Sequence, residues 1–189
     1  MSSHFFVIQK YFKNSRKEWI KIMAQDMNLN VKHIVAESTN ILSTNFGGGH
    51  IYSITIGEDM DNGLIVCRDA YLGDETWSAK KYVAGEEPLF LLAPPVVPFT
   101  QLKGYADEDR FYNKSGDRVR AYTLRAGDRV SLSENAFESA PAVGDYVTYD
   151  ADAKQYVVGA VANDKFCAQV LSKIVRSNLV MYKLQVVSL

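Results

Sequence analysis

Short stretches of alternating apolar and polar residues, each ended by turn-forming residues, are the feature that most constrains how this chain folds. The clearest is NLVMYKLQVVSL at residues 178–189, where Val180, Tyr182, Leu184 and Val186 fall on one side of an extended chain. Side chains of a β-strand point alternately to its two faces, so this pattern predicts a strand with one buried face.

Similar stretches recur at intervals of roughly ten residues, which is typical of a β-sandwich or barrel. Strands are also predicted at residues 50–57, 63–68, 76–83, 119–124, 129–132, 145–149, 155–160 and 166–175. Asp61-Asn62-Gly63 resembles a hairpin turn, so the stretch 63–68 is predicted to pair with 50–57. Helical patterns are confined to residues 5–24 and one turn after Ser133. The sequence therefore predicts a mainly β fold, an antiparallel β-sandwich or barrel, with a short N-terminal helix or arm.

A proline-rich segment at residues 88–98 divides the chain. Prolines cannot donate hydrogen bonds to a β-ladder, so this segment is predicted to be a sheet edge or a connector. Three regions follow: a basic N-terminal extension at 1–26, a first β region at 27–98 and a second at 99–189. Two small β subdomains and one larger sandwich both fit this division.

The N-terminal segment differs from the rest of the chain in charge. Residues 1–22 carry five Lys or Arg side chains against Glu18. A basic and aromatic segment of this kind suits a membrane-surface helix, a nucleic-acid-binding arm or a partner-binding tail. Met23 and Met27 are alternative starts, so the segment is equally well interpreted as an upstream extension.

The composition argues against two classes of protein, specific nucleic-acid binders and proteins with a membrane-spanning segment. The 189 residues have a net charge of −1, and 47% of them are hydrophobic. This balance does not favour a specific nucleic-acid partner, and no apolar run reaches the roughly 18 residues of a membrane span. Cys67 and Cys167 stand alone in the sequence and are predicted to be buried, reduced thiols.

No stretch matches a catalytic or metal-binding motif. Residues 45–50 are glycine-rich but lack the Lys and the following helix of a phosphate-binding loop. Three histidines show no zinc-type spacing, and the acidic stretch 57–63 lacks the glutamate of a calcium loop, so it is predicted to be a solvated hairpin loop. The sequence therefore predicts a protein that is not an enzyme, with no metal site and no cofactor.

Arginines are concentrated at residues 110–129. Alternation along the predicted strand 118–124 places Arg118, Arg120 and Tyr122 on one face, and Arg125 and Arg129 lie in the following turn and strand. Asp117, Asp128 and Glu134 are interleaved with these arginines, which favours local ion pairs. A solvated face is one interpretation, and a protein-docking surface is the other. The candidate docking residues are Arg118, Arg120, Tyr122, Arg125 and Arg129.

Short strand-like and turn-like stretches follow one another in a recognisable order. They are residues 43–46, 61–66, 109–112, 114–117, 120–124, 125–129 and 141–147, followed by Phe166. In this order the chain resembles small β-rich structural proteins of tailed bacteriophages. The resemblance covers roughly residues 27–170 and consists of texture and order, with no strict motif. The proteins it resembles are head-associated proteins of the capsid decoration or auxiliary type.

The resemblance implies a non-enzymatic virion protein that is made in the cytoplasm of the bacterial host. Its implied partner is the major capsid protein, and its implied action is to bind and stabilise the assembled capsid as a homo-oligomer on a symmetric lattice. Many copies on such a lattice need only modest affinity each. The alternative function is a β-sandwich module that binds a ligand or carbohydrate, with Trp77, Tyr71 and Tyr82 as its aromatic platform.

Overall fold

Extended strands make up nearly all of the regular structure in the part of the chain that the structure describes. The computed structural model describes residues 32–41, 50–93, 111–159, 165–176 and 179–189. They form a six-stranded antiparallel sheet, in the order β1-β7-β11-β10-β8-β9, and a closed five-stranded barrel, in the order β2-β4-β3-β5-β6. The prediction of a mainly β fold is confirmed, and of the two divisions that the sequence left open, the structure has the two β subdomains. The elements are β1 (Ala36–Asn40), β2 (Ile51–Thr55), β3 (Ile65–Gly73), β4 (Thr76–Lys81), β5 (Leu89–Leu91), β6 (Arg118–Thr123), β7 (Arg129–Ser133), η3 (Glu134–Ala136), β8 (Tyr146–Asp150), β9 (Gln155–Val158), β10 (Cys167–Arg176) and β11 (Leu179–Ser188).

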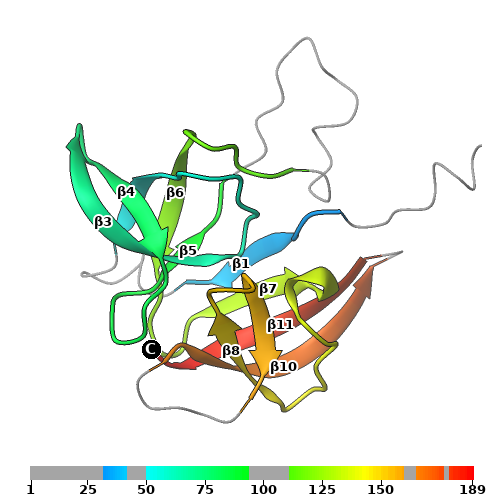
Figure 1. Cartoon of the computed structure of the whole chain (residues 1–189). Helices are drawn as coiled ribbons and strands as arrows, with labels where there is room; N and C mark the ends of the chain where they lie inside the picture. Colours follow the sequence, from blue (N-terminus) through cyan, green and yellow to red (C-terminus); the bar gives the residue numbers. More distant parts are fainter. Residues whose placement is uncertain (1–31, 42–49, 94–110, 160–164, 177–178) are drawn as a thin grey trace, which may run out of the picture. The chain divides into compact units, whose positions relative to one another are not determined.

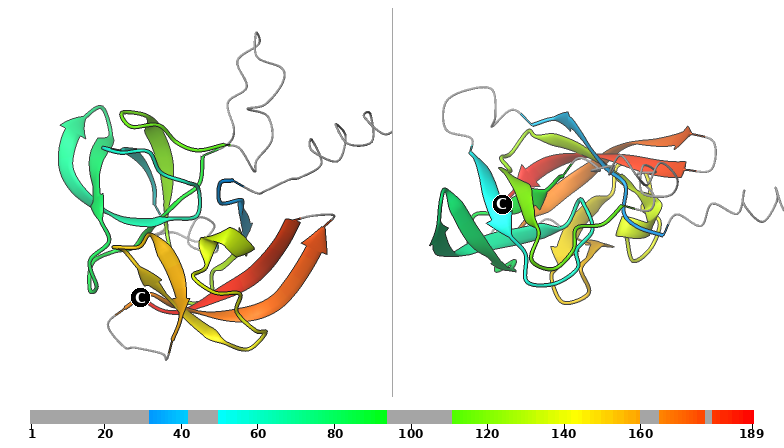
Figure 2. Two further views of the ribbon diagram at one scale, coloured as in Figure 1. Left: turned by 45° about the vertical axis from the view of Figure 1, so that its right-hand side comes forward. Right: turned by 90° about the horizontal axis from the view of Figure 1, so that it is seen from above.

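The barrel is inserted between two neighbouring strands of the sheet. β1 pairs with β7, with Asn40 opposite Arg129, although all five barrel strands lie between them in the sequence. Figure 1 shows β1, drawn in blue, beside the yellow-green β7, and the left view of Figure 2 shows the cyan-to-green barrel strands grouped together. The division between barrel and sheet therefore does not fall at the predicted boundary between residues 98 and 99. β1, which lies before that boundary, belongs to the six-stranded sheet, and β6, which lies after it, belongs to the barrel.

Strands with clear alternation occur where the sequence predicts them. On β6 the buried residues are Val119, Ala121 and Thr123, and Arg118 and Arg120 are exposed. A 3-10 turn follows Ser133 as predicted, but the Ser133 side chain does not cap it. Its hydroxyl oxygen instead accepts the backbone N–H of Val35 at 2.8 Å, which ties the start of β1 to β7.

The predicted hairpin between residues 50–57 and 63–68 is wrong. β2 pairs in parallel with β4 and antiparallel with β6, and β3 pairs with β4 and β5. The reason lies in Asn62 and Gly63, which are buried and not part of a solvated turn. The Asn62 amide accepts the N–H of Ala93 at 3.0 Å and donates to its carbonyl at 2.8 Å, so the connection is fixed against another strand end.

Gly63 allows the barrel to approach the sheet closely. Its φ is +86°, and a Cβ at this position would lie 2.6 Å from Leu132 Cδ2 on β7. The carbonyl of Gly63 also accepts the hydroxyl of Tyr156, on β9, at 2.6 Å. Buried side chains from both sheets form one hydrophobic cluster, so the barrel and the sheet share a core.

The structure tests the predictions for the proline-rich segment and the two cysteines, but not that for the N-terminal extension. β5 lies inside the proline-rich segment and pairs with both β3 and β6, so residues 89–91 are neither a sheet edge nor a connector. Cys67 and Cys167 are both buried and free, as predicted. The predicted extension at residues 1–26 lies outside the described part of the chain. In the part that is described, no helix has the length and apolar character needed to cross a bilayer.

Candidate functional site

The outward side of β6 carries the first three candidate docking residues. Arg118 and Arg120 are exposed there, and Tyr122 is half-buried. β6 has hydrogen-bonded neighbours on both sides in the closed barrel, β5 and β2, so its backbone is held firmly. The predicted alternation thus places these three side chains along one rigid row.

The neighbouring strand β2 places two hydroxyl side chains and one isoleucine beside this row. Arg118 lies opposite Thr55, Arg120 opposite Ser53, and Tyr122 opposite Ile51, which is 52% exposed. Residues directly opposite each other on paired strands project to the same face. We call this surface the β6 face, defined by Arg118, Arg120, Tyr122, Ile51, Ser53 and Thr55.

The acids near these arginines serve other contacts. The Asp117 carboxylate accepts the backbone N–H of Lys114 at 2.9 Å, and the Asp128 carboxylate accepts that of Arg125 at 2.8 Å. Glu134 accepts the Tyr182 hydroxyl at 2.9 Å. Among the residues that the structure describes, Arg118, Arg120 and Arg129 form no ion pair, so the expectation of local pairs is wrong for them.

The remaining two candidate residues are not on the β6 face. Arg125 lies in the turn between β6 and β7, and Arg129 is the first residue of β7, opposite Asn40 and Gln185 in the sheet. The structure therefore divides the five predicted residues into a row of three on the barrel and two that lead into the sheet.

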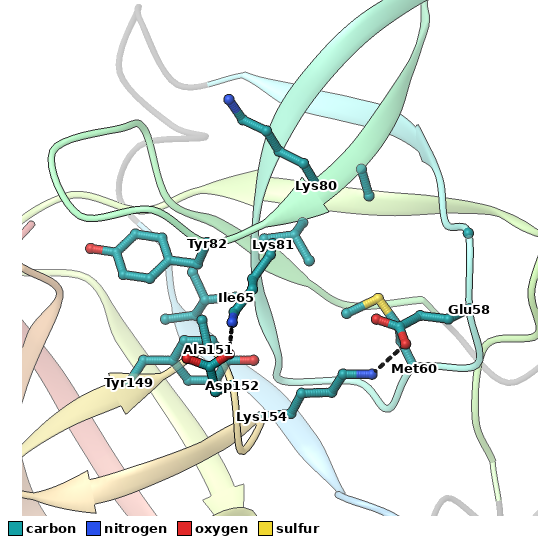
Figure 3. A pocket seen from close by; sticks show the side chains of 13 residues that line it. Glu58, Met60, Ile65, Lys80, Lys81, Tyr82, Tyr149, Ala151, Asp152 and Lys154 are labelled. Carbon is teal, nitrogen blue, oxygen red and sulfur yellow. Dashed lines mark hydrogen bonds and ion pairs between the residues drawn. The ribbon is translucent and has the colours of Figure 1, made fainter.

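A cavity of about 440 Å³ lies where the β8–β9 turn meets the barrel. Figure 3 shows two ion pairs at this cavity, Lys81 with Asp152 and Lys154 with Glu58. Lys154 Nζ is 2.8 Å from Glu58 Oε2. The barrel contributes the cation to one pair and the anion to the other, so the two contacts have opposite polarity.

Tyrosine side chains line the same cavity. Burial raises the pKa of Tyr149 well above its usual range, against the opposing effect of a hydrogen bond with the backbone of Ile65. Burial likewise raises the pKa of Tyr82, whose hydroxyl oxygen accepts the N–H of Phe166 at 2.8 Å. Both hydroxyls stay protonated at neutral pH and contact backbone groups, so we interpret this cavity as a joint between barrel and sheet.

A second cavity of about 430 Å³ contains a His–Asp pair. His33 Nδ1 is 2.7 Å from Asp61 Oδ1, and the His33 ring stacks on Tyr112 with centroids 4.8 Å apart. Asp61 Oδ2 also accepts the N–H of Ile34 at 3.1 Å. These two contacts of Asp61 hold the segment before β1, which contains His33 and Ile34, against the barrel.

The acidic stretch 57–63 does not connect a hairpin, although Gly57, Glu58 and Asp59 are exposed as predicted for a solvated loop. Asp59 Oδ1 accepts the backbone N–H of Ser115 at 2.9 Å, and Met60 is buried. Within the described segments, no three His, Cys, Asp or Glu side chains gather closely enough to hold a metal ion.

An aromatic cluster on the barrel includes part of the predicted carbohydrate platform. The rings of Tyr71 and Trp77 meet edge to face with centroids 5.0 Å apart. Tyr82 is 7% exposed and lies at the joint cavity, so it does not belong to this cluster. Arg68 does, because its guanidinium lies over both Trp77 and Tyr52. The sequence signal for Arg68 was a charged residue directly at the end of the apolar run 63–67.

No protein family model, curated protein or solved structure matches this sequence. The chemistry of the described surfaces is therefore the basis for assigning a function.

Proposed function

We propose that this chain is a non-enzymatic structural protein of a phage virion, a capsid decoration or head-associated protein. In this role it binds the assembled capsid through the β6 face, as many copies on a symmetric lattice, and stabilises the shell. The observation that carries the proposal is the pair of exposed arginines, Arg118 and Arg120, which form no ion pair with any other described residue. Two exposed cations on a strand that is hydrogen-bonded on both sides suit an acidic partner surface.

The composition of the β6 face supports a protein partner. Arginine and tyrosine are enriched at protein interfaces, where a guanidinium can bind a carboxylate through two hydrogen bonds. Ser53 and Thr55 add hydroxyl groups beside the arginines, and Ile51 adds an exposed apolar group. Each copy needs only weak affinity, because neighbouring copies on a closed lattice share the binding energy.

The first test is the composition of virions. Mass spectrometry of purified virions, from the phage that encodes the chain, is expected to find the protein in a fixed ratio to the major capsid protein. Its absence from these particles would contradict the proposal.

The second test is charge reversal on the β6 face. The full-length protein is mixed with virions from a phage deleted for it, and co-sedimentation is measured. We expect Arg120→Glu to weaken binding by about tenfold or more, equivalent to ~1.4 kcal/mol, and Arg120→Lys to retain most of it. Binding by the wild-type protein is expected to weaken as salt is added.

Lys165→Glu is the matched control, since Lys165 is exposed but belongs to the segment that leads into β10. If it weakens binding as much as Arg120→Glu, the β6 face is not the contact surface. If every variant binds virions like the wild type, the arginines have no part in docking.

A further inference from the structure

The guanidinium of Arg68 is held between two aromatic rings. Its central carbon lies 4.3 Å from the centroid of the Tyr52 ring and 5.2 Å from that of Trp77. Arg68 Nη2 donates to Glu87 Oε2 at 2.8 Å. Contact with two ring faces and one carboxylate fixes the orientation of the guanidinium plane.

Tyr71 adds an exposed ring to this group. The ring packs against Trp77, and its hydroxyl oxygen accepts the backbone N–H of Glu75 at 3.3 Å, within the tight β3–β4 turn. Tyr71 is nevertheless 53% exposed. The ring is thus positioned by the protein while much of it faces solvent.

The charges of Arg68 and Glu87 compensate each other and remain accessible. Their side chains are 32% and 36% exposed, respectively. The hydroxyl of Thr123 donates to Glu87 Oε1 at 3.3 Å. The guanidinium has five N–H donors, and a carboxylate accepts several hydrogen bonds, so both retain capacity for a ligand. This surface offers a donor and an acceptor side by side at no net charge.

We propose that this aromatic–arginine cluster, defined by Tyr52, Arg68, Tyr71, Trp77 and Glu87, binds a neutral pyranose unit of a glycan. The apolar C–H face of the sugar packs on the exposed tyrosine ring. One of two neighbouring hydroxyls accepts from the guanidinium, and the other donates to the carboxylate. Ligand sites in proteins combine aromatic area with a few fixed polar groups in this way.

The cluster is separate from the β6 face, so this inference goes beyond capsid docking. Tyr52 lies opposite Ala121, whereas its neighbour Ser53 lies opposite Arg120. Adjacent residues of a strand point to opposite faces, which places the Tyr52 ring and the Arg120 side chain on opposite sides of the barrel wall. The β6 face carries two exposed arginines that form no ion pair within the described segments, and it suits acidic partners. The neutral aromatic–arginine cluster suits an uncharged partner.

The test begins with the full-length protein on an array of neutral and acidic glycans. Neutral hexose-containing glycans are expected to bind, and the best of them is then titrated in solution. The chain has two tryptophans, so Trp19→Phe leaves Trp77 as the only tryptophan fluorophore. Its emission is expected to change and to saturate as the glycan is added.

Two variants locate the site. Tyr71→Ala is expected to raise the Kd at least tenfold, because the exposed stacking surface is lost. Leu72→Ala is the matched control: Leu72 is the next residue along the same strand and is 56% exposed, so its truncation is expected to leave the Kd unchanged. Glu87→Gln keeps the shape and removes the carboxylate, and we expect it to weaken binding while stacking persists.

A readout on the wild-type protein makes the result independent of how the variants fold. In an NMR titration, the indole N–H resonance of Trp77 is expected to shift with the same saturation curve as the fluorescence. The proposal is overturned if no neutral glycan binds at millimolar concentration, or if Tyr71→Ala and Leu72→Ala bind alike. Binding only to acidic glycans, abolished by Arg120→Glu, would also overturn it and assign the sugar to the β6 face. Incorporation into virions is measured separately, so a negative result here leaves the capsid proposal standing.

Discussion

A turn that ends in a Gly-Asp pair directly precedes each of β6, β7 and β8. In each, a glycine with φ between +87° and +98° precedes an aspartate whose carboxylate accepts the backbone N–H three residues earlier. The turns are residues 114–117, 125–128 and 142–145. A carboxylate that accepts from the backbone of its own turn holds the chain reversal in place.

The aspartates of these three turns differ in burial, so substituting a buried one and an exposed one tests what burial contributes. Asp128 is 0% exposed, whereas Asp117 is exposed. We expect Asp128→Ala to lower the free energy of unfolding by about 1–3 kcal/mol, because it removes a fully buried carboxylate that is hydrogen-bonded to the Arg125 N–H. Asp117→Ala is expected to cost less than ~1 kcal/mol, because water replaces the lost acceptor. Urea denaturation measures both, and equal losses would show that burial is not the deciding factor.

At the scale of elements, alternation predicted the strands well but not their partners. β6 and β11 are clear in the sequence because each has one buried face. β1 (AESTN) has no apolar alternation, since its residues range from half-buried to exposed, and β5 is a run of three fully buried residues. Strand pairing depends on contacts distant in sequence, such as that of Asn62 with Ala93, which no local pattern encodes.

The same distinction, between alternation within one strand and pairing between strands, applies to the candidate site residues. The row of Arg118, Arg120 and Tyr122 depends only on alternation within one strand, so the sequence was sufficient to predict it. The aromatic–arginine cluster depends on the pairing of β3 with β4, which contains irregularities between Arg68 and Gly73. Such shifts change which side chains meet across strands, and the sequence does not reveal where they occur.

The β8–β9 turn and the barrel are joined by the two ion pairs of opposite polarity. We expect Lys154→Glu or Glu58→Lys alone to destabilise the protein by roughly 0.5–1 kcal/mol, since each single change places like charges together. The double variant restores an attractive pair and is expected to recover most of the loss. Urea denaturation at low and high salt measures this coupling, which should shrink as salt is added. Additive losses in the double variant would mean that the two side chains do not interact.

At the scale of the whole molecule, tyrosine hydroxyls link the sheet and the barrel through backbone groups. Tyr156 of β9 donates to Gly63 before β3, and Tyr82 after β4 accepts from Phe166 before β10. Tyr156 is 1% exposed, and its ring also contacts Phe137, Tyr149 and Phe166. These bonds satisfy backbone groups that the shared core would otherwise bury without partners.

Removing one such hydroxyl is expected to loosen the joint. Tyr156→Phe keeps the ring but leaves the Gly63 carbonyl without this donor, which we expect to cost about 1–3 kcal/mol of unfolding free energy. Tyr122→Phe is the control, because Tyr122 is half-buried on the β6 face. Denaturation followed by separate probes of barrel and sheet is expected to give coincident transitions for the wild type. A loss no greater in Tyr156→Phe than in the control would contradict the inferred role of the bond.

The same tyrosines predict sensitivity to high pH. Burial raises the pKa of Tyr149 and Tyr156 above the usual 10.0. Above pH ~10 the unfolded chain loses these protons and the folded protein keeps them, so the unfolded state binds fewer protons and stability falls as pH rises. The stabilising effect is complete below that pH. Unfolding free energies across the alkaline range are expected to decline, and less steeply for Tyr156→Phe; a flat profile would contradict this.

The insertion of the barrel between β1 and β7 also sets the order in which a nascent chain can fold. The backbone N–H of Val35 can bond to the Ser133 hydroxyl only after Ser133, 98 residues later in the sequence, has been synthesised. At ribosomal rates of roughly 5–20 residues per second, this delay is about 5–20 s. All five barrel strands are synthesised during that time, so the barrel can close before β1 has a neighbour. Folding is therefore expected to begin with the barrel, and β1 is expected to be among the last strands to pair.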